Sequence, residues 1–554
     1  MLFPTMTFAL FFVVVLGVAW RLNDRPKQWR WFMLGASYLF YGWWDWRFMF
    51  LLAACTVGNH VFATGVHRSR GDRARRTWMV VGVTFDLVLL GFFKYYGFFV
   101  DSLIALLRPF GLAPTPLLIK VTLPVGISFF LFCAISYVVD VYRREQEPVA
   151  PLDFAVYLSF FPHLVAGPIV RVSEFVPQLR RRRNPESVDA VRAVRLICRG
   201  LFKKVVIANY LATSIVDPVF VAPGQFRNWE LLVGAWSYAV QIYADFSGYT
   251  DIAIGIAMLL GIRFPDNFDR PYTSTSIQEF WRRWHMTLSR WLRDYLYIPL
   301  GGNRGGEAKE RRNLIITMVL GGLWHGANFT FLFWGLYHGL GLSIERWVRE
   351  GPDRRAAAAR AAREAADRPD TSRPTPDHVS VAADETVADV DLSLLAVDES
   401  PEERAAAERA RAAAQAARTD QLHHEHLPES STAMRHDEQV ARRSVHPALA
   451  CFGVFQFVTV GWIFFRAQDM GTAFKYLSSL VTNWGVGTLV TPTVLLVLFV
   501  GLFAQFLPQR LGDALEYKAS QLPPLLIAVG VGLWLVVINL LGPQGVAPFI
   551  YFQF

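Results

Sequence analysis

Apolar segments long enough to cross a lipid bilayer recur along this chain of 554 residues, of which 53% are hydrophobic and 14% aromatic. A helix needs roughly 20 apolar residues to cross the hydrocarbon core. A membrane β-barrel would instead show segments of about ten residues with alternating polarity, and this pattern is missing from the sequence. The sequence therefore predicts an all-α polytopic membrane protein with roughly ten to twelve crossings, judged by segment length and charge.

The formal charge of +9 is concentrated in short basic loops between the apolar segments, at 21–30, 67–76 and 180–183. Basic loops stay in the cytoplasm, so the N-terminus is expected outside and these loops inside, against an anionic leaflet. A nucleic-acid surface is not expected in loops flanked by membrane segments. The 4 cysteines are far apart and have no metal-ligand spacing, so we predict no metal site.

Three membrane-length segments are not expected to form simple straight spans. Trp31–Val66 has an aromatic, polar centre, which predicts a hairpin of two short spans. Phe154–Val170 contains Pro162 and Gly167, which predict a broken or re-entrant helix that must be buried in protein. Leu314–Ile344 is long and rich in glycine, which predicts a kink or a two-part passage.

The stretch 350–443 interrupts the membrane core, which we divide into a first part, 1–349, and C-terminal helices, 444–554. This stretch is rich in Ala, Arg, Glu, Asp and Pro and cannot bury a core. We predict a charged, disordered cytoplasmic insertion with fluctuating helix at 354–366 and 401–417. Its tract His423-His424-Glu425-His426 fits a solvated linker better than a metal site, because no second ligand cluster accompanies it.

The sequence also lacks a phosphate-binding glycine loop, a His-Glu-x-x-His zinc motif and a Gly-x-Ser-x-Gly nucleophile elbow. The sequence therefore argues against ATP-driven transport, metalloprotease and serine hydrolase functions.

His325 is the strongest candidate for chemistry, because it lies near the middle of the apolar segment Leu314–Ile344. An ionisable group at bilayer depth usually has a function, although a buried histidine bonded to a backbone carbonyl is the alternative. In one straight helix His338 would lie about 20 Å away and about 220° around the axis, so the two could not share a proton. We expect His338 to be the more easily hydrated, structural or interfacial one. The glycines beside each histidine predict close helix approach.

Five further residues are candidates, each with a structural alternative: His285 as a second catalytic residue, Arg304, Asp251 and Asp245 as substrate- or cofactor-binding residues, and His163, like His338, as a secondary candidate. His285 lies in a separate segment that can reach His325, or is an interfacial histidine among tryptophans. Asp245 and Asp251 either orient groups at the site or form buried ion pairs with basic residues. Arg304 follows a glycine-rich turn suited to a phosphate, or only marks the cytoplasmic side. His163 either lines a pocket or caps a broken helix.

Several motifs around these residues resemble the membrane-bound O-acyltransferase (MBOAT) family, and within it the membrane subunits of bacterial alginate O-acetylation. They are DFSGYTD at 245–251, EFWRRWH at 279–285, RDYLYIPLGGNR at 293–304, LWHGA at 323–327, FPHLVAGPIVR at 161–171 and PFIYFQF at 548–554. The resemblance implies a ring of transmembrane helices, with re-entrant segments, around a thin central site. It places the catalytic histidine at His325 and a second matched histidine at His285. Asp251 and Arg304 fall in matching motifs, whereas His163 stands where we expect glutamine.

The resemblance also implies an activity, which we state as an expectation. An acyl thioester, acetyl-CoA or another, serves as donor substrate from the cytoplasm, and no cofactor is bound. The neutral imidazole of His325, favoured by burial, deprotonates an acceptor hydroxyl. Arg304, His285 or backbone amides hold the oxyanion. The partners are an extracytoplasmic SGNH-hydrolase-like acetyltransferase and a polysaccharide acceptor, at the inner membrane of a bacterium.

Two alternatives belong to other classes. A non-catalytic acyl or glycan transporter would move its cargo without releasing a thiol. A D-alanyl-type transferase would take its acyl group from a carrier-protein thioester and deliver it to a cell-wall polymer.

Overall fold

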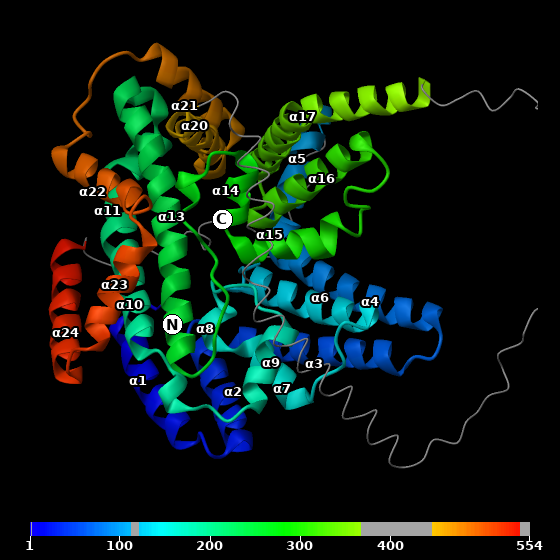
Figure 1. The fold of residues 1–554 in the computed structure, drawn as a ribbon, viewed down its shortest axis with the longest axis vertical. Helices are drawn as coiled ribbons and strands as arrows, with labels where there is room; N and C mark the ends of the chain where they lie inside the picture. The colour runs from blue at the N-terminus through cyan, green and yellow to red at the C-terminus, as the bar shows by residue number, and fades with distance from the viewer. Residues whose placement is uncertain (2, 112–120, 367–445, 543–554) are drawn as a thin grey trace, which may run out of the picture. The chain divides into compact units, whose positions relative to one another are not determined.

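The structure is a computed structural model that describes residues 1, 3–111, 121–366 and 446–542. Within these residues the chain consists of helices and their connections, with no β-strand (Figure 1). The chain divides into two compact units, Met1–Arg349 with Ala450–Phe554, and Glu350–Leu449. The all-α prediction is confirmed, and the first unit carries every candidate site residue.

The N-terminal part is a series of helices joined by short turns: α1 (Met6–Arg21), α2 (Pro26–Gly42), α3 (Arg47–Arg68) and α4 (Asp72–Leu90). Thr5 begins α1 by accepting the N–H of Phe8 at 3.2 Å, and Pro26 occupies the first position of α2, where its missing N–H costs nothing. The helical hairpin expected over 31–66 is confirmed as α2 and α3, and the expectation that both helices cross the membrane stays a prediction.

After α4 the helix widens into a π-helical turn, η1 (Gly91–Tyr95), and continues as α5 (Tyr96–Leu107) and η2 (Arg108–Phe110). Such π-turns are rare and often lie at functional positions. Beyond residue 121 follow α6 (Ile127–Arg143), α7 (Pro151–Ser159), α8 (Phe161–Leu164) and α9 (Val172–Arg180). The break expected within 154–170 is confirmed, because α7 ends at Ser159 and no helix covers 165–171.

The centre of the fold is the 32-residue helix α13 (Asn228–Leu259), most of which is buried. It packs on α10 (Ala190–Leu201), which is followed by η4 (Phe202–Ala208), α11 (Asn209–Leu211), η5 (Ala212–Val216) and α12 (Asp217–Val221). Glycines allow this contact, because a Cβ on Gly248 would lie 2.8 Å from the carbonyl oxygen of Gly200. No side chain fits between the two backbones.

A polar connection then leads to the candidate site. It contains η7 (Pro271–Thr273), α14 (Ile277–Arg283), α15 (Met286–Leu292) and η8 (Arg293–Tyr297), and it ends in α16 (Glu307–His325) and α17 (Phe329–Ala366). The helix predicted at 354–366 is confirmed as the distal part of α17. The helix predicted at 401–417 and the histidine tract at 423–426 lie outside the described residues.

The C-terminal helices are α20 (Pro447–Arg466), α21 (Met470–Thr482), α22 (Pro492–Phe503), α23 (Gln509–Ser520) and α24 (Pro524–Leu541). Five helical stretches in the described part are long and apolar enough to cross a membrane: Arg47–Arg68, Asp72–Phe110, Ala190–Val221, Pro447–Arg466 and Pro524–Leu541. α24 exposes Leu525, Val529 and Leu533, as a lipid-facing helix would. The chain is a polytopic membrane protein, and the predicted number of crossings stays a prediction.

Candidate active site

His325 is the last residue of α16, because the chain leaves the helix at Gly326 with an extended backbone. Asn328 starts α17 by accepting the N–H of Thr330 at 3.0 Å. The expected kink in Leu314–Ile344 is therefore a complete break directly after the candidate base. His325 is held at a helix terminus and not in the middle of a straight span.

The glycines of this segment bring α16 and α17 into backbone contact. A Cβ on Gly322 would lie 2.3 Å from the carbonyl oxygen of Phe331, and one on Gly335 would lie 2.3 Å from that of Met318. The predicted close approach at the glycines is confirmed, and the neighbouring helix is the other half of the same segment.

The imidazole of His325 is 3% exposed and is surrounded by aromatic rings. Ring centroids of Trp324, Trp334 and Phe465 lie 4.9, 5.1 and 5.2 Å from its own. These three residues belong to α16, α17 and α20, so three helices surround the imidazole of His325. His285 and Lys94 lie close enough to interact electrostatically with His325.

Lys94 and Tyr95, both in η1, bind the carbonyl oxygens at the end of α16. The Nζ of Lys94 donates to the carbonyl oxygens of Trp324 at 2.5 Å and His325 at 2.9 Å. The hydroxyl of Tyr95 donates to the carbonyl oxygen of Leu323 at 2.7 Å. These donors satisfy carbonyls that a helix C-terminus leaves without intrahelical partners, and the cation suits the negative end of the helix dipole.

A cavity of about 770 Å³ reaches this point. We name it the Lys94 cavity, and its wall includes Thr5, Tyr41, Lys94, Ser128, Phe129 and Trp324. Trp43 and Trp44, in the turn between α2 and α3, also line it, so it approaches the side opposite the basic loops 21–30 and 67–76. Its lining includes Trp324 but not the ring of His325.

His285 lies at the start of α15 with a left-handed backbone, at φ 42°. This conformation is strained for a residue other than glycine and persists only where neighbours enforce it. The Oδ1 of Asn267 accepts the N–H of Thr287 and lies 3.1 Å from the Nδ1 of His285. Nδ1 is therefore the donor, and in the neutral ring Nε2 is the acceptor.

The two histidines expected to be catalytic, His325 and His285, thus share one aromatic cluster. The ring of Trp324 lies 6.2 Å from that of His285 and 4.9 Å from that of His325. The His285 ring is completely buried, and its Nε2 has no hydrogen-bond partner among the described residues. The expectation that His285 can reach the region of His325 agrees with this placement, and its chemical role stays a prediction.

Asp245 and Asp251, both on α13, form ion pairs with the segment α10–η4. Asp251 accepts from Arg199 at 2.6 Å and from Lys203 at 2.8 Å, and Asp245 pairs with Lys204. Neither carboxylate lines the Lys94 cavity. The ion-pair alternative fits these contacts, and a role in substrate binding stays a prediction.

Arg304 lies at the opposite end of α16 from His325. Gly301, Gly302, Gly305 and Gly306 all have positive φ, so the turn is glycine-dependent, as expected, and Arg304 is exposed on it. The 19-residue helix α16 separates it from His325 by about 27 Å. Arg304 therefore cannot hold an oxyanion beside His325, which corrects that expectation. A role in binding a donor phosphate stays a prediction.

His338 and His163 are both buried in aromatic surroundings. His338 is 0% exposed, within 5.2 Å of the rings of Trp281 and Trp334, so the expectation that it is the more easily hydrated histidine is wrong. The break after His325 folds α17 back along α16 and removes the assumed exposure. His163 lies 2.9 Å from the carbonyl oxygen of Tyr157 near the end of α7, which fits the capping alternative.

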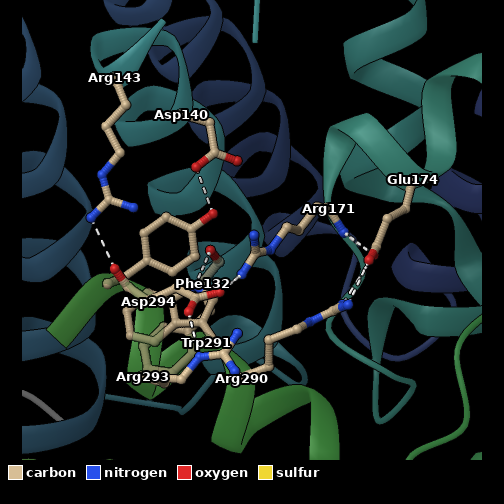
Figure 2. Close-up of polar contacts among 10 residues, drawn as sticks. Phe132, Asp140, Arg143, Arg171, Glu174, Arg290, Trp291, Arg293 and Asp294 are labelled. Carbon is tan, nitrogen blue, oxygen red and sulfur yellow. Dashed lines mark hydrogen bonds and ion pairs between the residues drawn. The ribbon is translucent and has the colours of Figure 1, made fainter. Parts of the chain in front are cut away.

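Figure 2 shows a polar network that the sequence did not reveal, which joins Asp140, Arg143 and Arg171 to Asp294 and its neighbours. Arg171 pairs with Asp294, whose backbone carbonyl also accepts from Arg143 at 2.8 Å. Tyr295 donates to Asp140 at 2.6 Å. Burial raises the pKa of Asp294, but hydrogen bonds from Arg293 and Arg171 outweigh it and leave the pKa below its ordinary value.

This network continues into the candidate site through stacked rings. Trp291, three residues before Asp294, donates its Nε1–H to the carbonyl oxygen of Phe132 at 3.0 Å and stacks on its ring at 3.7 Å (Figure 2). Phe132 in turn stacks on Trp324 at 5.2 Å. The orientation of Trp324 is thus supported from the side of the network as well as by η1.

The structure thus places a buried histidine at a helix break, near a second buried histidine and next to a tryptophan that lines a cavity. Residues 77–356 match the membrane-bound O-acyltransferase family, MBOAT. The chain belongs to this family.

Individual relatives have more particular names. The chain is 46% identical over 343 residues to the protein named "Probable alginate O-acetylase AlgI" of Pseudomonas aeruginosa, a match that covers 61% of this chain and 64% of that protein. It is 39% identical over 348 residues to the "Peptidoglycan O-acetyltransferase" of Helicobacter pylori, covering 58% and 64%. It is 30% identical over 238 residues to the "Teichoic acid D-alanyltransferase" of Streptococcus thermophilus, covering 41% and 57%. These matches thus span less than two thirds of each relative's length.

Proposed function

We propose that this chain is a membrane O-acetyltransferase of a bacterial inner membrane. It takes an acetyl group from a cytoplasmic thioester, acetyl-CoA, and passes it toward the O-acetylation of a polysaccharide outside. The names of the relatives at 39% and 46% identity support acetyl transfer to such polymers. The single observation that carries the proposal is the position of His325, directly after Trp324, which lines the Lys94 cavity.

In this proposal the imidazole of His325 is the general base. A thiol is a good leaving group, so the difficult step is removal of the proton from the acceptor hydroxyl. Trp324 lines the cavity whereas the His325 ring does not, so the acceptor reaches the imidazole when the Trp324 side chain moves aside. His285, oriented by Asn267, is assigned to the same site as a second polar group.

The acetyl group is then passed to an extracytoplasmic, SGNH-hydrolase-like acetyltransferase, which places it on the polymer. Arg304 is assigned to the phosphates of the donor, because it is exposed on a glycine turn at the other end of α16. The ring of roughly ten to twelve crossings around a thin centre is part of this proposal. The thin centre leaves only a short distance between the thioester on the cytoplasmic side and the acceptor on the outer side.

The test replaces His325 by alanine in the host and measures ester-linked acetate on the secreted polymer. Loss of a general base predicts a fall of about 10²-fold or more at unchanged membrane insertion. His338→Leu is the matched control, because it removes another buried imidazole that also packs on Trp334 and should leave the acetate content near that of the wild type. Unchanged acetate in the His325 variant would refute the assignment.

D-alanyl transfer is the second candidate, because relatives named teichoic acid D-alanyltransferase match 41% of this chain. The same polymer hydrolysate separates the two, since it releases either acetate or D-alanine. A transporter without chemistry predicts a third result. Inside-out membrane vesicles would then release no thiol from acetyl-CoA, with or without His325.

A further inference from the structure

Lys94 is a basic residue within the stretch Asp72–Phe110, one of the stretches long and apolar enough to cross a membrane. A cation at such a position is costly, and a residue kept there usually serves a function. Lys94 lies in the π-helical turn η1 and is one of the residues that line the Lys94 cavity. Neither its helix nor its bonds to α16 require a cation, because a neutral donor would also bind carbonyl oxygens.

Tyr95, the next residue in the same turn, is such a neutral donor. Tyr95 binds the carbonyl oxygen of Leu323 through a neutral hydroxyl, as Lys94 binds the next two carbonyls. Both residues therefore anchor α16 to η1, but only Lys94 adds charge. It also lies 5.8 Å from the centroid of the Trp324 ring, in the range of a cation–π contact.

The ammonium of Lys94 retains one unused donor. It has three N–H groups, and the carbonyl oxygens of Trp324 and His325 take two of them. In the described part of the chain no third acceptor lies within hydrogen-bond distance of Nζ. Because Lys94 borders the cavity, a substrate oxygen bound in the cavity is the group that this donor would bind.

We infer that Lys94 is a further catalytic residue of the acyl transfer proposed above: its ammonium binds the carbonyl oxygen of the acyl group and stabilises the negative charge that develops there. The inference rests on the proposed function. A fixed cation in a site with little water stabilises such a charge far more than it would in solution.

The reaction balances with the groups named. The acceptor oxygen forms a bond to the acyl carbon while its proton moves to the imidazole of His325, and the carbonyl π electrons move to the oxygen that Lys94 holds. When the carbonyl re-forms, the C–S bond breaks and the thiolate takes the proton back from the imidazolium. One thioester and one alcohol give one ester and one thiol.

The test measures acyl transfer from radiolabelled acetyl-CoA in inside-out membrane vesicles of the native host, with rates normalised to inserted protein. Lys94→Met removes the charge, and Tyr95→Phe removes only an anchor. We expect Lys94→Met to lower kcat by about 10²–10³-fold, as for loss of one oxyanion donor, with little change in the KM for acetyl-CoA. Tyr95→Phe removes one neutral hydrogen bond and should cost about tenfold at most. Lys94→Arg keeps the charge and should recover part of the rate.

Three results would overturn the inference: equal losses for Lys94→Met and Tyr95→Phe, a Lys94→Met defect confined to KM, or a Lys94→Arg variant that inserts but is as inactive as Lys94→Met. If Lys94→Met does not insert into the membrane, the rates of Lys94→Arg and Tyr95→Phe are compared. Equal rates for these two variants would mean that Lys94 only anchors α16 and would overturn the inference. A His325→Ala variant that stays active refutes the proposed function itself, and this separates the two failures.

Discussion

The contact between α16 and α17 predicts that one added methyl group displaces His325. The perturbation is Gly322→Ala. Its Cβ would lie 2.3 Å from the carbonyl oxygen of Phe331 and 3.1 Å from the Cα of Gly335. A carbon and a carbonyl oxygen normally approach no closer than about 3.3 Å, so the backbones must separate by about 1 Å. Both obstacles are backbone atoms and cannot rotate away.

That shift falls three residues before His325, at the end of the same helix. A displacement of about 1 Å at a catalytic group costs on the order of 10²-fold in rate. The assay is acetyl transfer in membrane vesicles, normalised to inserted protein. We expect a loss of that size with the protein still present in the membrane.

Gly321→Ala is the matched control on the same helix. Its Cβ would meet only the Cδ1 of Leu292, at 3.1 Å, the far end of a side chain that can move. It should retain most of the activity. Equal activity of the two alanine variants would refute the argument that the glycine contact positions His325.

Two other predictions concern stability in detergent. Asp294 has a lowered pKa, so its carboxylate stabilises the folded protein above the ordinary aspartate pKa of about 4, and this contribution is lost as the pH falls through the folded-state pKa. The melting temperature of the wild type should therefore fall more steeply below about pH 4 than that of Asp294→Asn, and parallel curves would contradict this reasoning. Asp251→Asn leaves Arg199 and Lys203 without their carboxylate and should cost roughly 3 kcal/mol, the low end for a buried pair because Arg199 is 45% exposed. Its melting temperature should drop, whereas Asp45→Asn, at an exposed pair with Arg47, should leave the melting temperature unchanged.

The parts of the fold that the sequence predicted are those with local signals. Glycines and excess length in Leu314–Ile344 predicted a break, and Pro162 with Gly167 predicted another. The aromatic turn within 31–66 predicted a hairpin. Each of these residues affects the backbone conformation at its own position, so the prediction does not depend on contacts with distant parts of the chain.

The contacts that complete the candidate site join residues far apart in the sequence. Lys94 binds carbonyl oxygens 230 and 231 positions away, a contact that no local pattern predicts. A lone lysine in an apolar segment was the available signal. The motif that contains Arg304 does not indicate its distance from His325, because that distance depends on the length of α16.

The stack of Trp291, Phe132 and Trp324 has a consequence for the permeability of the membrane. An enzyme that joins a cytoplasmic donor to an external acceptor contains a path between two compartments, and an open path would dissipate ion gradients. The ring centroids of this stack lie 3.7 and 5.2 Å apart, and the stack forms an apolar layer that ends at Trp324, beside His325. Ions cross such a surface only at high energetic cost. In the proposed mechanism the aromatic stack therefore acts as an insulator, and only the acyl group is passed from one compartment to the other.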